Sequence, residues 1–159
     1  EGIEKVAVLD FDVHHGNGTQ QIFEDDPSVF FVSSHQMPLY PGSGSPEETG
    51  AGNILNLPLA PGSGSASLQA VWARHGLPAV AAFEPDLILV SAGFDAHVRD
   101  PLAQLEAENS DYEWLTREIM ALAEAYCGGR LVSILEGGYD LEGLAGAARA
   151  HVEALLQAR

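Results

Sequence analysis

The stretch Val6-Ala-Val-Leu-Asp-Phe-Asp-Val-His-His-Gly-Asn-Gly18 decides the fold. Its first residues, 6–9, form a short run of β-branched and apolar side chains, which predicts a buried strand. Side chains alternate along an extended chain, so Asp10, Asp12 and His14 fall on one face. Three potential metal ligands therefore gather where a strand ends. The alternative is a solvated turn in which the acids cap a following helix near residue 19.

Further apolar runs, and apolar residues at helical spacing, follow along the rest of the chain. Apolar runs at 29–33, 87–90 and 131–135 predict three further strands, and helical spacing predicts helices at 19–24, 66–83, 112–126 and 141–157. Strands that alternate with helices imply crossover connections. We therefore expect an α/β fold, a three-layer α/β/α arrangement whose mainly parallel sheet is covered on both faces.

Capping residues and loop-forming residues predict where some of these elements begin and end. Asp111 is the expected N-cap of the third helix, and Gly128 follows its end. Ser65 closes a Pro-Gly-Ser-Gly-Ser connector and is expected to cap the second helix. The Pro- and Gly-rich residues 34–53 are expected to form an irregular loop, and loops of that length are usually functional.

Composition narrows the classes of protein that fit. The 159 residues carry 7 Lys and Arg against 23 Asp and Glu, a formal net charge of -16. This charge repels phosphate backbones and anionic lipids, so we expect neither nucleic-acid nor membrane partners. A lone cysteine, Cys127, excludes an intrachain disulfide and fits a reducing compartment, so we expect a cytoplasmic protein.

A second cluster of candidate ligands follows the predicted strand at 87–90. Asp95 comes shortly after that strand ends and could join Asp12 and His14. Two carboxylates and one imidazole form a three-ligand site with an open position, the arrangement of catalytic zinc. Such oxygen-rich ligation also accepts Fe(II) or Co(II). The alternative for Asp95 is an N-cap or turn acid.

The last predicted strand ends in Glu136-Gly-Gly-Tyr-Asp140. Paired glycines let the backbone approach a ligand closely and present Tyr139 at the edge of the sheet. A tyrosine beside a metal can donate a hydrogen bond to a developing oxyanion. The alternative is a glycine turn followed by a tyrosine that only packs.

Four motifs together resemble the histone deacetylase and acetylpolyamine amidohydrolase superfamily, in particular its bacterial class II-like members. They run in order over nearly the whole chain: Asp10-Phe-Asp-Val-His-His-Gly-Asn-Gly-Thr19, Tyr40-Pro-Gly-Ser-Gly44, Ser91-Ala-Gly-Phe-Asp-Ala96 with Asp100-Pro-Leu102, and Glu136-Gly-Gly-Tyr-Asp-Leu141. The resemblance implies a zinc-dependent amidohydrolase that removes acetyl groups from acetyl-lysine or acetylated amines.

The resemblance also assigns roles to residues. It implies that Asp12, His14 and Asp95 bind zinc and that Tyr139 polarises the acetyl carbonyl. Residues of the substrate channel are then Tyr40, Leu102 and Gly137, and Asp100 is a buried acid that supports the site. His15 is expected to be a supporting residue, and the other histidines match no metal-ligand position. Potassium-like cations are implied at two places: one at Asp10, Asp12, His14, Ser33 and Ser34, and a second at the carbonyls of Phe23 and Val29.

The family's catalytic domain is longer than this chain, and its general-base histidines lie upstream of the first strand. We therefore expect residues 1–159 to be the C-terminal part of one deacetylase-like catalytic domain. We expect it to be inactive alone, and to self-associate or pair with a missing N-terminal half. One alternative is a non-catalytic metal-binding or interaction half-domain.

A second alternative is a haloacid-dehalogenase-like phosphatase, in which Asp10 and Asp12 would be the nucleophile and the acid. His14 and His15 stand where that family has a Gly-Thr pair. Lys5 is the only lysine, and it lies outside any plausible site. Both features argue against the phosphatase.

Overall fold

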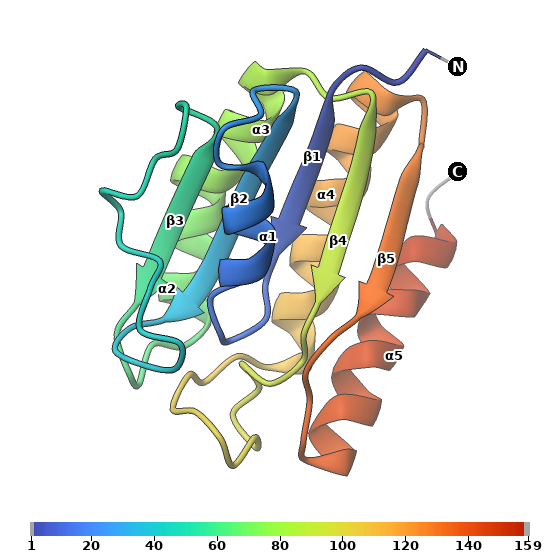
Figure 1. The fold of residues 1–159 in the computed structure, drawn as a ribbon. Helices are drawn as coiled ribbons and strands as arrows, with labels where there is room; N and C mark the ends of the chain where they lie inside the picture. The colour runs from blue at the N-terminus through green and yellow to red at the C-terminus, as the bar shows by residue number, and fades with distance from the viewer. Residues whose placement is uncertain (1, 158–159) are drawn as a thin grey trace.

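A computed structural model describes residues 2–157, whose five strands form one sheet in the order β3-β2-β1-β4-β5 (Figure 1). Every described pair of neighbouring strands is parallel. The α/β fold with a parallel sheet is therefore confirmed. The strands are β1 (Val6–Asp10), β2 (Val29–Gln36), β3 (Ile54–Leu59), β4 (Leu87–Ala92) and β5 (Leu131–Leu135).

The helices distribute unequally between the two faces of the sheet. Figure 1 shows α1 in front of the sheet, whereas the other helices lie behind it. Within the described residues, the expected second layer is thus limited to α1. No described helix is both long and apolar enough to cross a lipid bilayer. The helices are α1 (Asn17–Phe23), α2 (Ser65–Val71), the π-helical turn η1 (Trp72–Gly76), α3 (Leu77–Phe83), α4 (Asn109–Cys127) and α5 (Leu141–Gln157).

Strand alternation divides the core into two clusters. Leu9, Val90 and Trp72 belong to the larger cluster, which joins the sheet to the helices behind it. Val8 and Phe31 belong to a smaller cluster beneath α1. Each strand between helix layers thus buries both of its faces, as expected for a parallel sheet.

The front of the sheet beside β5 is open. Val132 and Ile134 on β5 are about half exposed, at 48% and 52%. The described residues provide no strand beyond β5, so one of its edges has no backbone partner in this part of the chain. This strand edge and the apolar side chains next to it form a surface that could pair with another segment.

Strand β3 is the one element that the sequence patterns did not predict. Asn56 and Pro58 interrupt its apolar run, and both residues disfavour strands. Pro58 is tolerated because β3 pairs with β2 only and leaves its other edge free within the described residues. Residues 34–36, expected in the loop, extend β2.

The predicted caps need correction at two helices. Asp111 is not the N-cap of α4: Glu108 is, and Asp111 lies in the first turn, where its Oδ2 accepts the Glu108 N–H at 2.8 Å. Ser65 is the first residue of α2, not its cap, and its hydroxyl donates to Asp111 at 2.6 Å. One carboxylate therefore ties the starts of two helices together. Gly128 follows the end of α4, as predicted, and has a positive φ.

Trp72 is the largest fully buried side chain, and its indole N–H donates to Ser34 Oγ at 2.9 Å. We expect Trp72→Phe to lower the free energy of unfolding by about 2 kcal/mol, because it opens a cavity and removes this hydrogen bond. Urea unfolding measures the loss. Trp114→Phe, at the half-buried second tryptophan, is the matched control and should cost less than half as much. Equal losses in both variants would contradict this account of the core.

Candidate functional site

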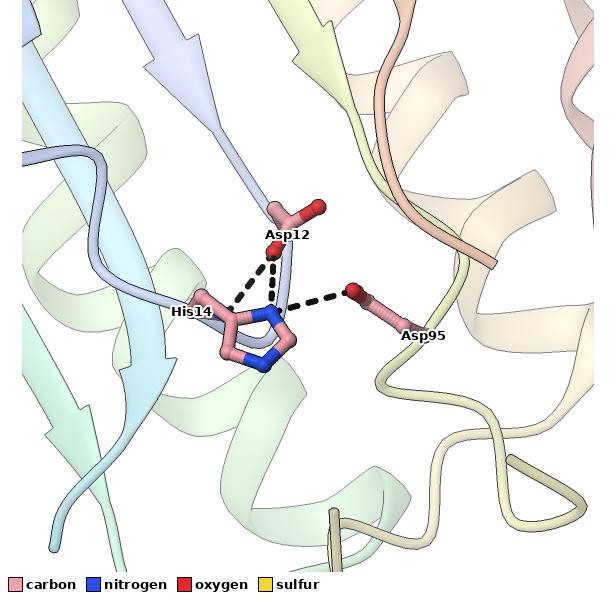
Figure 2. A group of neighbouring side chains, drawn as sticks. All are labelled: Asp12, His14 and Asp95. Atoms are coloured by element: carbon pink, nitrogen blue, oxygen red, sulfur yellow. Dashed lines mark hydrogen bonds and ion pairs between the residues drawn. The ribbon is translucent and has the colours of Figure 1, made fainter. Parts of the chain in front are cut away.

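The loops that follow β1 and β4 bring three candidate metal ligands together. Asp12 and His14 follow β1, and Asp95 follows the adjacent strand β4. His14 Nδ1 lies 3.0 Å from Asp12 Oδ1 and 3.2 Å from Asp95 Oδ2 (Figure 2). One donor atom of each residue lies within 4.8 Å of the others. The cluster sits at the carboxyl ends of parallel strands, where such sheets place their sites.

The geometry and charge of this cluster fit a divalent cation. Two ligands of a tetrahedral zinc are about 3.3 Å apart, close to the separations from His14. Asp95 Oδ2 is buried and accepts no hydrogen bond in the described structure. Burial, followed by the charge of Asp12, raises the pKa of Asp95 to about 7. A bound cation would remove this repulsion and satisfy the free oxygen.

Backbone N–H groups fix the orientation of the two carboxylates. Val13 N–H donates to Asp95 Oδ1 at 2.8 Å. Gly137 N–H donates to Asp12 Oδ2 at 3.0 Å. Each carboxylate is thus held by a loop that follows a different strand. The ligands are therefore positioned by the order of the strands as well as by their own loops.

Two glycines make room for the cluster. A Cβ at Gly137 would overlap Asp95 Oδ2 and lie 2.7 Å from Asp12 Oδ2. A Cβ at Gly93 would lie 2.5 Å from the Asp12 Cα. Neither position can carry a side chain unless the acids move. The glycines that the sequence places after β4 and β5 are thus required by close packing.

Tyr139 and the expected channel residues line one open pocket of about 630 Å³ with Asp12 and His14. The Tyr139 side chain is 55% exposed, and its pKa is raised by partial burial and by the charges of nearby acids, Asp95 first. The ring of Tyr40 lies edge-on to that of His14, with 6.4 Å between centroids. Leu102 and Gly137 complete this part of the lining.

Asp100 connects the two loops that carry Leu102 and Tyr139. Its Oδ1 accepts the Leu102 N–H at 3.0 Å, and its Oδ2 accepts the Tyr139 N–H at 2.8 Å. Asp100 is buried, as expected. It supports the pocket wall rather than the metal ligands themselves.

The residues expected to bind the first monovalent cation lie close to the same strand ends. Asp10 is the last residue of β1 and is paired in register with Ser33 on β2. Burial and the charge of Asp12 raise the pKa of Asp10 well above its usual value. The Ser34 hydroxyl instead faces the helix layer, where it accepts the Trp72 N–H.

The residues expected to bind the second monovalent cation lie elsewhere. Phe23 ends α1 and Val29 begins β2, so both lie toward the amino-terminal end of the strands. Their carbonyl oxygens accept hydrogen bonds from the side chain of Asn53. They are therefore remote from the cluster at Asp12.

A buried polar network behind His14 was not predicted beyond His15 itself. The His15 Nε2–H donates to Gln20 Oε1 at 2.9 Å, and its Nδ1 accepts the Ser43 hydroxyl at 2.8 Å. Gln20 in turn donates to Glu48 at 2.6 Å. Burial lowers the pKa of His15, which keeps its ring neutral. Both ring nitrogens are thus engaged away from the pocket.

The same network anchors the loop that carries Tyr40. Glu48 accepts the N–H groups of Gly44 and Ser45 at 3.0–3.1 Å. His35 Nε2–H donates to the Gly44 carbonyl at 2.9 Å, and burial lowers the pKa of His35 to about 4. The Ser-x-x-Glu spacing of Ser45 and Glu48 is the sequence signal that could have identified this anchor.

The remaining histidines and the cysteine lie apart from the candidate ligands. His151 is buried between the hydroxyls of Thr116 and Ser133, at 2.6 and 2.8 Å. His97 accepts the Arg99 N–H, and His75 is exposed on the π-helical turn. Cys127 is buried, as expected.

We expect the folded chain to bind one Zn²⁺, and Asp95→Asn to weaken binding by about 100-fold or more, because two remaining ligands hold zinc poorly against water. Competition with a zinc chelator measures the affinity. Asp25→Asn, an exposed acid outside the pocket, is the control and should bind zinc as the unchanged chain does. Absence of stoichiometric zinc, or no effect of Asp95→Asn, would remove this cluster as a metal site.

Comparisons with known proteins agree with one another. A family model described as "Histone deacetylase domain" matches residues 1–155. The chain is 46% identical to "Histone deacetylase 14, chloroplastic" of Arabidopsis thaliana, over 98% of this chain and 38% of that protein. It is 47% identical to a "Probable deacetylase" of Archaeoglobus fulgidus, over 90% of this chain and 41% of that protein. The solved HDA15 HD domain superposes with a TM-score of 0.92 at 39% identity, covering 98% of this chain and 45% of that one.

The chain spans less than half the length of these relatives. These matches give no support to the phosphatase alternative. The family model covers nearly every residue, and its match agrees with the sequence identities and with the fold. This chain therefore belongs to the histone deacetylase family.

Proposed function

We propose that this chain is the C-terminal part of the catalytic domain of a zinc-dependent deacetylase, which hydrolyses acetyl-lysine or another acetylated amine. The observation that carries the proposal is the cluster of Asp12, His14 and Asp95 in the pocket that Tyr139 also lines. Its family membership supports the reaction class. Water adds to the acetyl carbon, the C–N bond breaks, and acetate and the free amine leave.

The three ligands would hold the metal where an acetyl group can enter. Zinc, when bound, would supply a Lewis acid that polarises the amide carbonyl and promotes deprotonation of the attacking water. Fe(II) or Co(II) could serve with the same ligands. Tyr40 and Leu102 would flank the acyl chain. The closely packed backbone at Gly137 would form the floor.

Tyr139 would act as the oxyanion donor. Its raised pKa favours the protonated phenol at neutral pH, so the hydroxyl can donate to the oxygen that becomes negative. The hydrogen bond from its backbone N–H to Asp100 fixes the start of its side chain.

A general base must come from outside residues 1–159 in this proposal. Among the described histidines, His14 is assigned to the metal, and both ring nitrogens of His15 are engaged by Ser43 and Gln20. Neither is free to accept the proton of water. The family resemblance places two histidines upstream of β1 for this task.

The charge of the site and of the surface suggests further partners. We propose a structural K⁺ ion beside Asp10, Asp12 and His14, with oxygens of Ser33 and Ser34, because buried carboxylates need a compensating charge.

The net charge of -16 suits a cationic amine product and disfavours nucleic acids and membrane surfaces. The buried Cys127 is compatible with the cytoplasm, which we propose as the location.

In a protein that includes this chain and the upstream part of the domain, Tyr139→Phe should lower kcat for an acetyl-lysine peptide by about 100-fold or more, the scale for one oxyanion donor. Zinc content should not change. Tyr126→Phe, an exposed tyrosine on α4, is the matched control. Unchanged turnover of the Tyr139 variant with intact metal would exclude it from the mechanism.

The isolated 159 residues should turn over acetyl-lysine near background even with zinc bound, because a general base contributes about 10²- to 10⁴-fold. They should also self-associate in sedimentation experiments through the open face at β5. Ile134→Glu should reduce this association, whereas Leu156→Glu, on an exposed part of α5, should not. Addition of an N-terminal half should restore activity.

A monomer with ordinary enzyme turnover would contradict both the missing base and the exposed interface. A zinc-bound chain that stays inactive with the upstream part present would instead favour the non-catalytic metal-binding alternative.

A further inference from the structure

Three backbone carbonyl oxygens converge on the side chain of Asn53, at the end of the sheet opposite the metal ligands. Asn53 Nδ2 lies 2.8 Å from the Phe23 oxygen, 2.9 Å from the Asp26 oxygen and 2.8 Å from the Val29 oxygen. We call these three oxygens the carbonyl cage. Their partial negative charges favour a positive partner between them. The Phe23 and Asp26 oxygens also accept backbone N–H groups, those of Asp26 at 2.9 Å and Val29 at 3.1 Å.

The orientation of the Asn53 amide follows from its neighbours. Each of the three carbonyls can only accept a hydrogen bond, so the atom that faces them must be the NH₂ group. The other end of the amide faces the Ala51 N–H, a donor, at 3.0 Å. That end must therefore be the oxygen, and a flipped amide would lose every one of these bonds.

The Asn53 side chain is also fixed in place. The residue is only 4% exposed, and its own carbonyl accepts the Phe31 N–H at 2.9 Å, next to the start of β3. Gly50 packs so closely that a Cβ there would lie 2.9 Å from Asn53 Oδ1. If the side chain rotated out, the three cage oxygens would lose the Asn53 N–H groups. The Ala51 N–H would keep only its second acceptor, the Glu24 carbonyl at 2.7 Å.

A cation bound by the cage would need the point that lies at similar distances from all three oxygens, and the Asn53 nitrogen occupies that point. The residues at the expected second potassium site therefore do not fit a cation. We propose that the carboxamide of Asn53 replaces that cation, so that this end of the sheet is held together by a neutral side chain and binds no monovalent ion.

The replacement of a cation by the Asn53 amide is chemically reasonable. An amide NH₂ offers two hydrogens to three acceptors, and it carries only partial positive charge, so no ion has to be desolvated. The Asn53 side chain also links the turn at 24–28 to the end of the loop at 37–53 and the start of β3. Because this link is part of the chain, no bound ion is needed. The link is then independent of salt composition.

Crystals of the chain grown with Rb⁺, an anomalous scatterer that mimics K⁺, test the proposal directly. We expect no anomalous peak in the carbonyl cage and an Asn53 amide in the position described. A peak bonded to the oxygens of Phe23, Asp26 and Val29, with Asn53 rotated away, would overturn it. A peak beside Asp10 would concern the other cation site only.

Asn53→Ala provides a second test in solution, because it opens the cage. Thermal unfolding is compared in KCl and in choline chloride at equal ionic strength, since choline is too large for the cage. We expect K⁺ at ten times the Kd of the opened cage to raise the Tm of Asn53→Ala by about 3–6 °C more than that of the unchanged chain. Asn56→Ala, at a second buried asparagine nearby, should respond to K⁺ like the unchanged chain.

The unchanged chain supplies the reference because any K⁺ bound near Asp10 contributes equally in all three proteins. Equal K⁺ responses of Asn53→Ala and the unchanged chain would show that the amide does not exclude an ion. If Asn53→Ala does not fold, the Rb⁺ experiment on the unchanged chain still decides the question.

Discussion

The structure depends on two carboxylates that are forced together at the ends of adjacent strands. Asp12 follows β1 and Asp95 follows β4, and burial of one beside the other raises the pKa of Asp95. The arrangement requires backbone donors for the outer oxygens and glycines at 93 and 137 to make space. A cation bound between the two carboxylates would relieve their repulsion and stabilise the arrangement.

Sequence patterns were sufficient for most elements and for the candidate ligands. The apolar runs at 6–9 and 87–90 placed Asp12, His14 and Asp95 after two strands that prove to be adjacent. The expected alternation beyond Asp10 was wrong, because β1 ends there and residues 12–14 form a bend. Strand β3 was missed because Asn56 and Pro58 interrupt its pattern, and its burial comes from packing rather than propensity. The network of His15, Gln20 and Glu48 was also missed. The Ser-x-x-Glu spacing marks Glu48 as a cap, but its contact with Gln20, 28 residues away, forms only on folding.

The two ends of the sheet solve the same electrostatic problem in different ways. At the carboxyl end, ionisable carboxylates gather, and their raised pKa values show that they repel one another when no cation is bound. At the amino end, the gathered groups are neutral carbonyls, and the partial charge of the Asn53 amide is sufficient. The carboxyl end keeps an open pocket beside its charged groups, whereas the Asn53 amide fills the space between the carbonyls at the amino end.

The strand order also has a consequence for cooperativity. Strands β1, β2 and β3 extend the sheet in one direction from its centre, and β4 and β5 extend it in the other. The candidate ligands Asp12 and His14 follow β1 in the first group, and Asp95 follows β4 in the second. An ion bound by all three ligands would then connect the two groups of strands. Its loss would first weaken the pairing of β1 with β4, while each group of strands stays folded.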